Sequence, residues 1–119
     1  MAALCVVLSD DLLDSSRIAG HSRAAGFDPI TYRDSTALLA ALDRKPVLAL
    51  IDLLSPGLVL ETVVPALRAA RVRVIGFGSH VDAARLKAAR AAGCDEVLPR
   101  SAFFERLDEH LKEWASGAP

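Results

Sequence analysis

Cysteine is scarce in this sequence, and the two that are present suggest no metal or redox chemistry. Cys5 and Cys94 lie far apart in the chain and match no metal-binding or disulfide-exchange spacing. We therefore expect two free thiols, buried or half-buried, in a reducing compartment.

A surplus of either charge is also missing. Fourteen Lys and Arg residues are balanced by fifteen Asp and Glu residues, which gives a formal net charge of −1. Bulk electrostatics therefore give no reason to expect direct binding to nucleic acid or to an anionic membrane.

Long apolar runs and a leader segment are absent as well. No run approaches the roughly 18 residues that a membrane helix requires, because Asp52 and Glu61 interrupt the longest stretch. The first residues, MAALCVVLSDD, carry no basic leader and no small-residue cleavage site. We expect a cytoplasmic protein without a membrane span.

What is present is the composition of a folded domain. Apolar residues make up 52% and charged residues 24% of the 119 residues, a balance typical of globular proteins and unlike that of disordered chains. A chain of this length builds one core comfortably and two with difficulty. We predict one domain over residues 1–115 and a frayed tail, or the start of a linker, over 116–119.

Apolar runs of strand length alternate with segments of helical period. The expected strands are residues 4–8, 29–33, 47–51, 72–77 and 96–98, and the expected helices are 15–26, 35–45, 62–71, 83–93 and 101–114. Such alternation is typical of a parallel sheet covered by helices. Gly26 and Gly93 end two of the helical segments, where a left-handed cap is expected.

The third and the last helical segments carry further expectations. Pro65 is comfortable only in a first turn, so the third helix is expected to start near Val63 or Val64 and to stay short. The preceding loop, residues 53–62, is expected to turn at Ser-Pro-Gly, residues 55–57. In the last segment one apolar stripe is expected to face the core, formed by Phe104, Leu107, Leu111 and Trp114.

Acidic residues follow two of the expected strands. Asp10 and Asp11 come after the first strand, and Asp52 comes directly after the third. If the strand order is 2-1-3-4-5, these strands are neighbours and the three carboxylates converge where doubly wound folds bind ligands. Two charges about 5 Å apart repel by roughly 3 kcal/mol, so the cluster should hold a proton or a cation. Mg²⁺, which takes few carboxylates and keeps several waters, suits such a site.

Each acid also has a purely structural interpretation. Asp10 or Asp11 fits the N-cap of the first helix, and Asp52 fits a polar residue that opens a loop. The competing residues for that N-cap are Asp14, Ser15 and Ser16.

Three segments together resemble the receiver domain of bacterial response regulators, a CheY-like family: VVLSDD, LALIDLLSPG and ARLKAARAAGCDEVLPR. The resemblance covers nearly the whole chain in order and approximate spacing. It implies an α/β fold, the flavodoxin-like, doubly wound, five-stranded parallel sheet of order 2-1-3-4-5 with helices on both faces. In that family a histidine kinase or a phosphotransfer protein donates a phosphoryl group to an aspartate, and the modified domain signals to a downstream protein.

The resemblance assigns roles to individual residues. Asp52 matches the phosphoacceptor. Asp10 and Asp11 match the acidic pair that works with Mg²⁺, and the backbone carbonyl of Leu54 matches the third metal-binding point.

Several positions depart from the family pattern. Gly78 stands where the family has a hydroxyl residue, and Ser79 can substitute only if the loop is shifted by one. Arg100 replaces the family lysine and offers a planar fork instead of an ammonium group. Ser101 replaces the following proline and offers an N-cap for the last helix. Val97 stands at the aromatic switch position.

These observations leave two functions open. One is a signal receiver of a two-component phosphorelay, phosphorylated on Asp52 with the help of Mg²⁺. The alternative is a pseudo-receiver, the same fold used as a phosphorylation-independent protein interaction module. An enzyme or a cofactor-binding domain lacks support, because no glycine-rich phosphate loop follows the first strand.

A partner surface is expected on the fourth helix, the fifth strand and the last helix. Mixed charge there fits the salt bridges of a homodimer and equally fits an ordinary solvated face. The residues concerned are Arg85, Lys87, Arg90, Asp95, Glu96, Glu105, Arg106, Asp108 and Glu109.

Overall fold

The computed structural model describes residues 2–116, which form a five-stranded parallel sheet with helices packed on it. The strands are β1 (Ala3–Leu8), β2 (Phe27–Tyr32), β3 (Leu48–Asp52), β4 (Arg73–Gly78) and β5 (Glu96–Pro99). The helices are α1 (Leu12–Ala24), α2 (Ser35–Ala40), α3 (Leu60–Ala69), α4 (Ala83–Ala92), α5 (Arg100–Glu105) and α6 (Leu107–Ala115), with a 3₁₀ turn, η1 (Ala41–Arg44), after α2. Residues 117–119 of the expected tail lie outside the described part of the chain.

The strand order is β2-β1-β3-β4-β5, and every neighbouring pair is parallel. The predicted fold class, an α/β doubly wound sheet of order 2-1-3-4-5, is therefore confirmed. β1 and β3 lie side by side, with Leu8 opposite Ile51. The carboxyl ends of these two strands consequently meet at one edge of the sheet.

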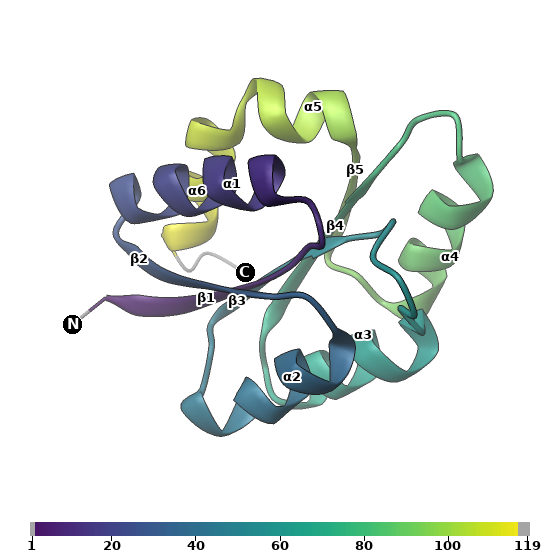
Figure 1. Ribbon diagram of the computed structural model, residues 1–119, viewed down its shortest axis with the longest axis horizontal. Helices are drawn as coiled ribbons and strands as arrows, with labels where there is room; N and C mark the ends of the chain where they lie inside the picture. The colour runs from purple at the N-terminus through teal and green to yellow at the C-terminus, as the bar shows by residue number, and fades with distance from the viewer. Residues whose placement is uncertain (1, 117–119) are drawn as a thin grey trace.

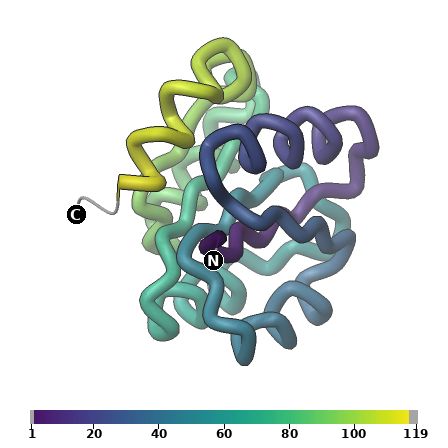
Figure 2. The backbone as a smooth tube through the Cα atoms, turned by 90° about the vertical axis from the view of Figure 1, so that its left-hand side faces the viewer, coloured from purple at the N-terminus to yellow at the C-terminus, as the bar shows by residue number. Residues whose placement is uncertain are grey.

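Helices cover both faces of the sheet, α1, α5 and α6 on one and α2, α3 and α4 on the other (Figure 1). Seen from the side, the C-terminal helices lie next to α1, and the sheet separates them from α2 and α3 (Figure 2). Alternate residues of β3 enter the two cores, because successive side chains of a strand point to opposite faces. Ala49 and Ile51 pack toward α2–α4, whereas Leu48 and Leu50 pack toward α1, α5 and α6.

Glycine ends two helices as predicted. Gly26 directly follows the C-cap of α1 with φ 95°, and Gly93 is the C-cap of α4 with φ 109°. Both angles lie in the left-handed region, which costs glycine little because it has no Cβ. Within residues 2–116, no helix is long and apolar enough to cross a membrane.

The two cysteines are free thiols, as predicted. Cys5 is buried in β1 and Cys94 is half-buried before β5. Burial raises the pKa of Cys5 to about 12 and that of Cys94 to about 11. Neither thiol is therefore a nucleophile at neutral pH, because only the thiolate attacks.

The prediction for the third helix is wrong. α3 begins at Leu60, not near Val63 or Val64, and carries Pro65 in its interior. The proline removes the N–H that would donate to the carbonyl of Glu61. Both residues lie on the exposed face, where water can satisfy that carbonyl. Burial of the opposite, apolar face stabilises the helix despite the missing bond.

The loop between β3 and α3 turns at the predicted Ser-Pro-Gly segment. The N–H of Leu58 donates to the carbonyl of Ser55 at 3.3 Å, and Gly57 has φ 71°. The N–H of Ser55 donates in turn to the carbonyl of Asp52 at 3.0 Å. The loop thus begins with a tight turn at the end of β3.

The C-terminal segment forms two helices, not the single helix that was predicted. The backbone leaves the helical region at Arg106, with φ −124° and ψ 32°, and separates α5 from α6. The expected N-cap at Ser101 is also wrong. Pro99 ends β5 with an extended backbone, φ −57° and ψ 145°, and Arg100 enters the helix directly, so Ser101 already lies in the first turn.

The apolar stripe of this segment starts one residue earlier than predicted. Phe103 is fully buried and Phe104 only half-buried, because a spacing of four residues leads from Phe103 to the buried Leu107 and Leu111. Trp114 is buried as predicted.

Candidate functional site

A pocket of about 350 Å³ lies at the carboxyl ends of the central strands. It contains five of the six candidate site residues predicted from the sequence, together with part of the loop that follows β3. The residues that line it are Asp10, Asp11, Asp14, Asp52, Leu54, Ser55, Pro56 and Arg100.

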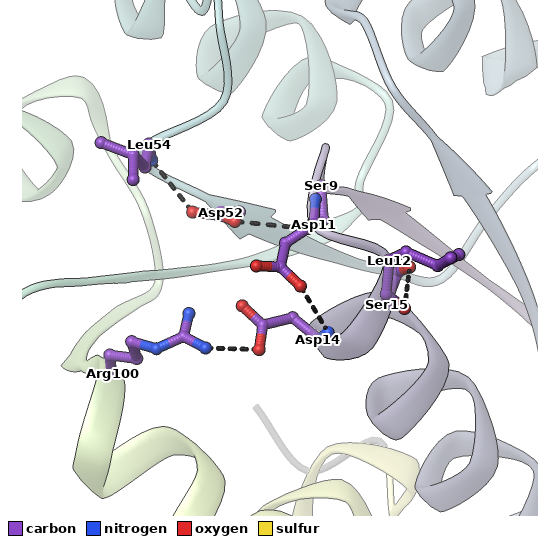
Figure 3. Close-up of polar contacts among 8 residues, drawn as sticks. All are labelled: Ser9, Asp11, Leu12, Asp14, Ser15, Asp52, Leu54 and Arg100. Atoms are coloured by element: carbon purple, nitrogen blue, oxygen red, sulfur yellow. Dashed lines mark hydrogen bonds and ion pairs between the residues drawn. The ribbon is translucent and has the colours of Figure 1, made fainter.

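Asp52 is the last residue of β3, and only 8% of its surface is exposed. Both of its carboxylate oxygens accept hydrogen bonds (Figure 3). The N–H of Leu54 donates to Oδ1 at 3.0 Å, and the hydroxyl of Ser9 donates to Oδ2 at 3.2 Å. These two bonds fix the carboxylate at the floor of the pocket.

Burial raises the pKa of the Asp52 carboxyl, and the negative charge of Asp14 adds to the rise. The hydrogen bonds from Leu54 and Ser9 and the positive charge of Arg100 lower the pKa of Asp52, but do not cancel the effect of burial. Burial and the nearby negative charge therefore disfavour the ionised form of Asp52, and a cation placed in the pocket would stabilise that form.

Asp11 is the N-cap of α1, so the structural role considered for Asp10 or Asp11 falls to Asp11. Its Oδ1 accepts a hydrogen bond from the N–H of Asp14 at 2.9 Å. Asp10 lies next to it at the mouth of the pocket, and its Oδ1 accepts from Nε of Arg33 at 3.2 Å. Capping and metal binding are compatible for Asp11, since a carboxylate has lone pairs on two oxygens.

The donor set fits a small hard cation that needs few protein ligands. Within residues 2–116, no three His, Cys, Asp or Glu side chains are grouped closely enough to hold a metal by themselves. Mg²⁺ needs only one or two carboxylates, because it keeps several of its waters. Asp11 and Asp52 line one pocket and supply that number.

Asp14 is a fourth acid in this pocket, and the only role predicted for it from the sequence is that of a helix cap. It is 4% exposed, and its Oδ1 forms an ion pair with the guanidinium of Arg100. Its Oδ2 is buried without a hydrogen-bond partner. The sequence held one signal for its burial: Asp14, Ile18 and Ser22 recur at intervals of four, and all three lie on the buried face of α1.

Arg100 is the first residue of α5 and lines the pocket. The hydrogen bond to Asp14 raises the pKa of the Arg100 guanidinium above the ordinary arginine value. The guanidinium also lies over the ring of Phe104, with 4.9 Å between Cζ and the ring centroid.

The structure does not bring the suggested hydroxyl substitute, Ser79, to Asp52. Ser79 lies in the exposed turn after β4, where its hydroxyl accepts from the N–H of Val81 at 3.3 Å, and it does not line the pocket. Gly78 ends β4, and the buried side chain of Leu53 fills the space beside it. Neither Gly78 nor Ser79 therefore brings a hydroxyl into the pocket.

Comparisons with known proteins agree with the architecture. The sequence matches no family model and no curated protein. Similar solved structures include a response-regulator signal receiver domain from Bermanella marisrubri, with 19% identity, a TM-score of 0.81, and coverage of 97% of this chain and 99% of that chain. The receiver domain of a sensor histidine kinase from Pseudomonas aeruginosa, described with a magnesium ion coordinated in its active-site cleft, has 17% identity, a TM-score of 0.81, and coverage of 98% and 99%.

The chemotaxis response regulator CheY4 of Vibrio cholerae is similar to the same degree, with 17% identity, a TM-score of 0.79, and coverage of 96% of this chain and 99% of that chain. At such low identities the likeness concerns the fold. The strand order, the helices on both faces and these structural matches show that the chain has the fold of response-regulator receiver domains.

Proposed function

We propose that this chain is a signal receiver of a two-component phosphorelay and accepts a phosphoryl group on Asp52. The observation that carries the proposal is the buried Asp52 carboxylate at the end of the central strand, in a pocket with Asp11, Asp14 and Arg100. The resemblance of the fold to receiver domains supports the same role. The role implies a cytoplasmic protein that takes phosphoryl groups from a histidine kinase or phosphotransfer protein and acts on a downstream protein.

The transfer is a displacement at phosphorus. An Asp52 carboxylate oxygen attacks the phosphorus of a phosphohistidine on the donor, and an O–P bond forms while the donor P–N bond breaks. The electron pair of the broken bond stays with the donor imidazole, which takes up a proton. The product is an acyl phosphate on Asp52 and a neutral histidine on the donor.

The chain's own residues prepare this step. Ser9 and the N–H of Leu54 orient the carboxylate, and Arg100 places one positive charge beside it. Asp11 and Asp52, with Asp10 as the partner acid and the carbonyl of Leu54 as a further oxygen, would hold Mg²⁺, which supplies neutralisation of the donor and acceptor charges when bound.

A second candidate is a pseudo-receiver that binds partners independently of phosphate. It is favoured by the packing of Leu53 against Gly78, because no hydroxyl is present there to follow a phosphoryl group. A homodimer through the last helices stays a prediction under either function.

The test is incubation with acetyl phosphate and Mg²⁺, followed by intact-protein mass spectrometry. We expect a gain of one phosphoryl group in the natural sequence and in Asp43→Asn, a control at an exposed carboxylate of η1. We expect no gain in Asp52→Asn. An unmodified natural sequence would reject the phosphorelay role and leave the pseudo-receiver.

A further inference from the structure

The ion pair between Asp14 and Arg100 joins the start of α1 to the start of α5 in the same pocket as the acceptor carboxylate (Figure 3). The two partners differ in exposure: the side chain of Asp14 is 6% exposed and that of Arg100 is 44% exposed. Asp14 is thus the fixed partner, and Arg100 is the partner that solvent and ligands can reach.

Charge in the pocket is unbalanced around this pair. Among the described residues that line it, Arg100 supplies the single positive charge, against the four carboxylates of Asp10, Asp11, Asp14 and Asp52. A phosphoryl group on Asp52 would bring roughly one to two further negative charges and new acceptor oxygens. Among residues 2–116, Arg100 supplies the guanidinium that lines the pocket and can meet them.

Arg100 does not need to leave Asp14 to do so. A guanidinium carries five N–H donors in a rigid plane, and the structure assigns one donor, on Nη2, to Asp14. Release would leave the Asp14 carboxylate buried without compensation, and removal of one partner from a buried pair costs far more than the pair itself contributes. Contact between the guanidinium and the ring of Phe104 holds it in place from another side.

We propose that Asp14 is a positioning residue, which anchors the guanidinium of Arg100 so that its remaining N–H groups face the phosphoryl group on Asp52. The inference rests on the proposed phosphorelay function and extends it to a residue outside the matched motifs. It explains how an arginine serves at the position of the family lysine: one edge of the fork binds the anchor and the other binds the ligand.

The proposal and simple electrostatics predict opposite signs for one substitution. Asp14→Asn removes a negative charge from the pocket and keeps the side-chain shape. Charge alone predicts that an incoming phosphoryl group is accepted faster, because repulsion is lower. The positioning role predicts slower acceptance, because the neutral amide holds the guanidinium less firmly.

The experiment measures the rate of phosphorylation by acetyl phosphate. For each variant, the Mg²⁺ concentration is raised until this rate no longer increases, so that a change in Mg²⁺ affinity does not affect the comparison. We expect the plateau rate of Asp14→Asn to fall about fivefold, within the effect of one charge-assisted hydrogen bond. We expect no change in Asp34→Asn, which alters net charge equally at the exposed N-cap of α2. A second variant, Asp14→Asn combined with Arg100→Gln, leaves no buried charge unpaired.

The double variant should react within twofold of Asp14→Asn, because an unanchored Arg100 contributes little. As a readout without metal or phosphodonor, hydrogen exchange of the Arg100 guanidinium protons by NMR should become faster in Asp14→Asn. An unchanged or raised plateau rate in Asp14→Asn, or a large further loss in the double variant, overturns the positioning role. If the natural sequence does not react at all, both the phosphorelay function and the positioning role fail. If it reacts but Asp14→Asn is not slower, only the positioning role fails.

Discussion

The side chain of Leu53 lies tightly against the backbone of Gly78. A Cβ on Gly78 would lie 3.3 Å from both Cβ and Cδ1 of Leu53, and Leu53 itself is fully buried. The residue that follows the candidate phosphoacceptor is therefore packed against the position that the resemblance aligns with the family's hydroxyl residue.

The first prediction concerns this packing. Gly78→Ala should lower the free energy of unfolding by about 1–3 kcal/mol, because the added methyl overpacks the core. Gly20→Ala is the matched control: Gly20 is exposed inside α1 with no atom within 4 Å of an added Cβ. That change should raise the free energy of unfolding by roughly 0.5–1 kcal/mol. Urea unfolding measures both, and equal effects would contradict the packing argument.

A second prediction concerns the Arg100–Asp14 pair. Arg100→Gln should destabilise the protein by about 2 kcal/mol, because it leaves the buried carboxylate without a cation, although half-exposure of Arg100 lets water relieve part of the loss. Arg106→Gln, at an exposed pair with Glu109 in which Nε and Oε2 lie 3.0 Å apart, should cost no more than about 0.5 kcal/mol. Thermal unfolding followed by circular dichroism compares them, and equal losses would show that the burial of Asp14 is immaterial.

The third prediction uses the raised pKa of Asp52. Because the folded state binds this proton more tightly than the unfolded chain, the contribution of Asp52 to stability is fully present below its ordinary pKa of 3.8 and is lost as pH rises through the folded-state value. Asp52→Asn removes this dependence. The variant should therefore gain stability relative to the natural sequence as pH rises from about 4 to 7, as measured by urea unfolding across that range. A stability difference that stays constant with pH would contradict the raised pKa.

A fourth prediction separates the two roles of Asp11. Asparagine caps helices as well as aspartate does, so Asp11→Asn should unfold at the same denaturant concentration as the natural sequence. Loss of one carboxylate ligand should nevertheless slow phosphorylation by acetyl phosphate roughly tenfold or more at a fixed low Mg²⁺ concentration. Chelation of Mg²⁺ with EDTA should abolish it in the natural sequence. Phosphorylation that persists in EDTA would remove Mg²⁺ from the proposal.

The alternation of apolar runs with segments of helical period predicted a parallel sheet covered by helices, and the resemblance to receiver domains supplied the strand order. The buried runs around Val7, Leu50 and Ile75 are too apolar for any strand but a central parallel one, and all three are fully buried. Asp52 could be placed at a strand end for the same reason, since a carboxylate ends the run. Both features can be read from a short segment of the sequence, without knowledge of the tertiary structure.

The errors arose where long-range packing decides. The start of α3 depends on burial of its apolar face, which outweighs the helix-breaking tendency of Pro65. The ion pair of Asp14 joins residues 86 positions apart, and no periodicity reveals such a partner. Leu53 beside Gly78 is a contact of the same kind: either residue alone looks ordinary in the sequence.

Phe77 connects the candidate site to the C-terminal helices. Its backbone carbonyl accepts from the N–H of Leu53 at 2.9 Å, and its ring stacks on Phe103 with centroids 4.2 Å apart. Phe103 stacks in turn on Trp114 at 6.3 Å, and Trp114 is the single tryptophan of the chain. The single tryptophan thus lies at the end of a chain of aromatic rings that begins at Phe77, the residue opposite Asp52 in the neighbouring strand.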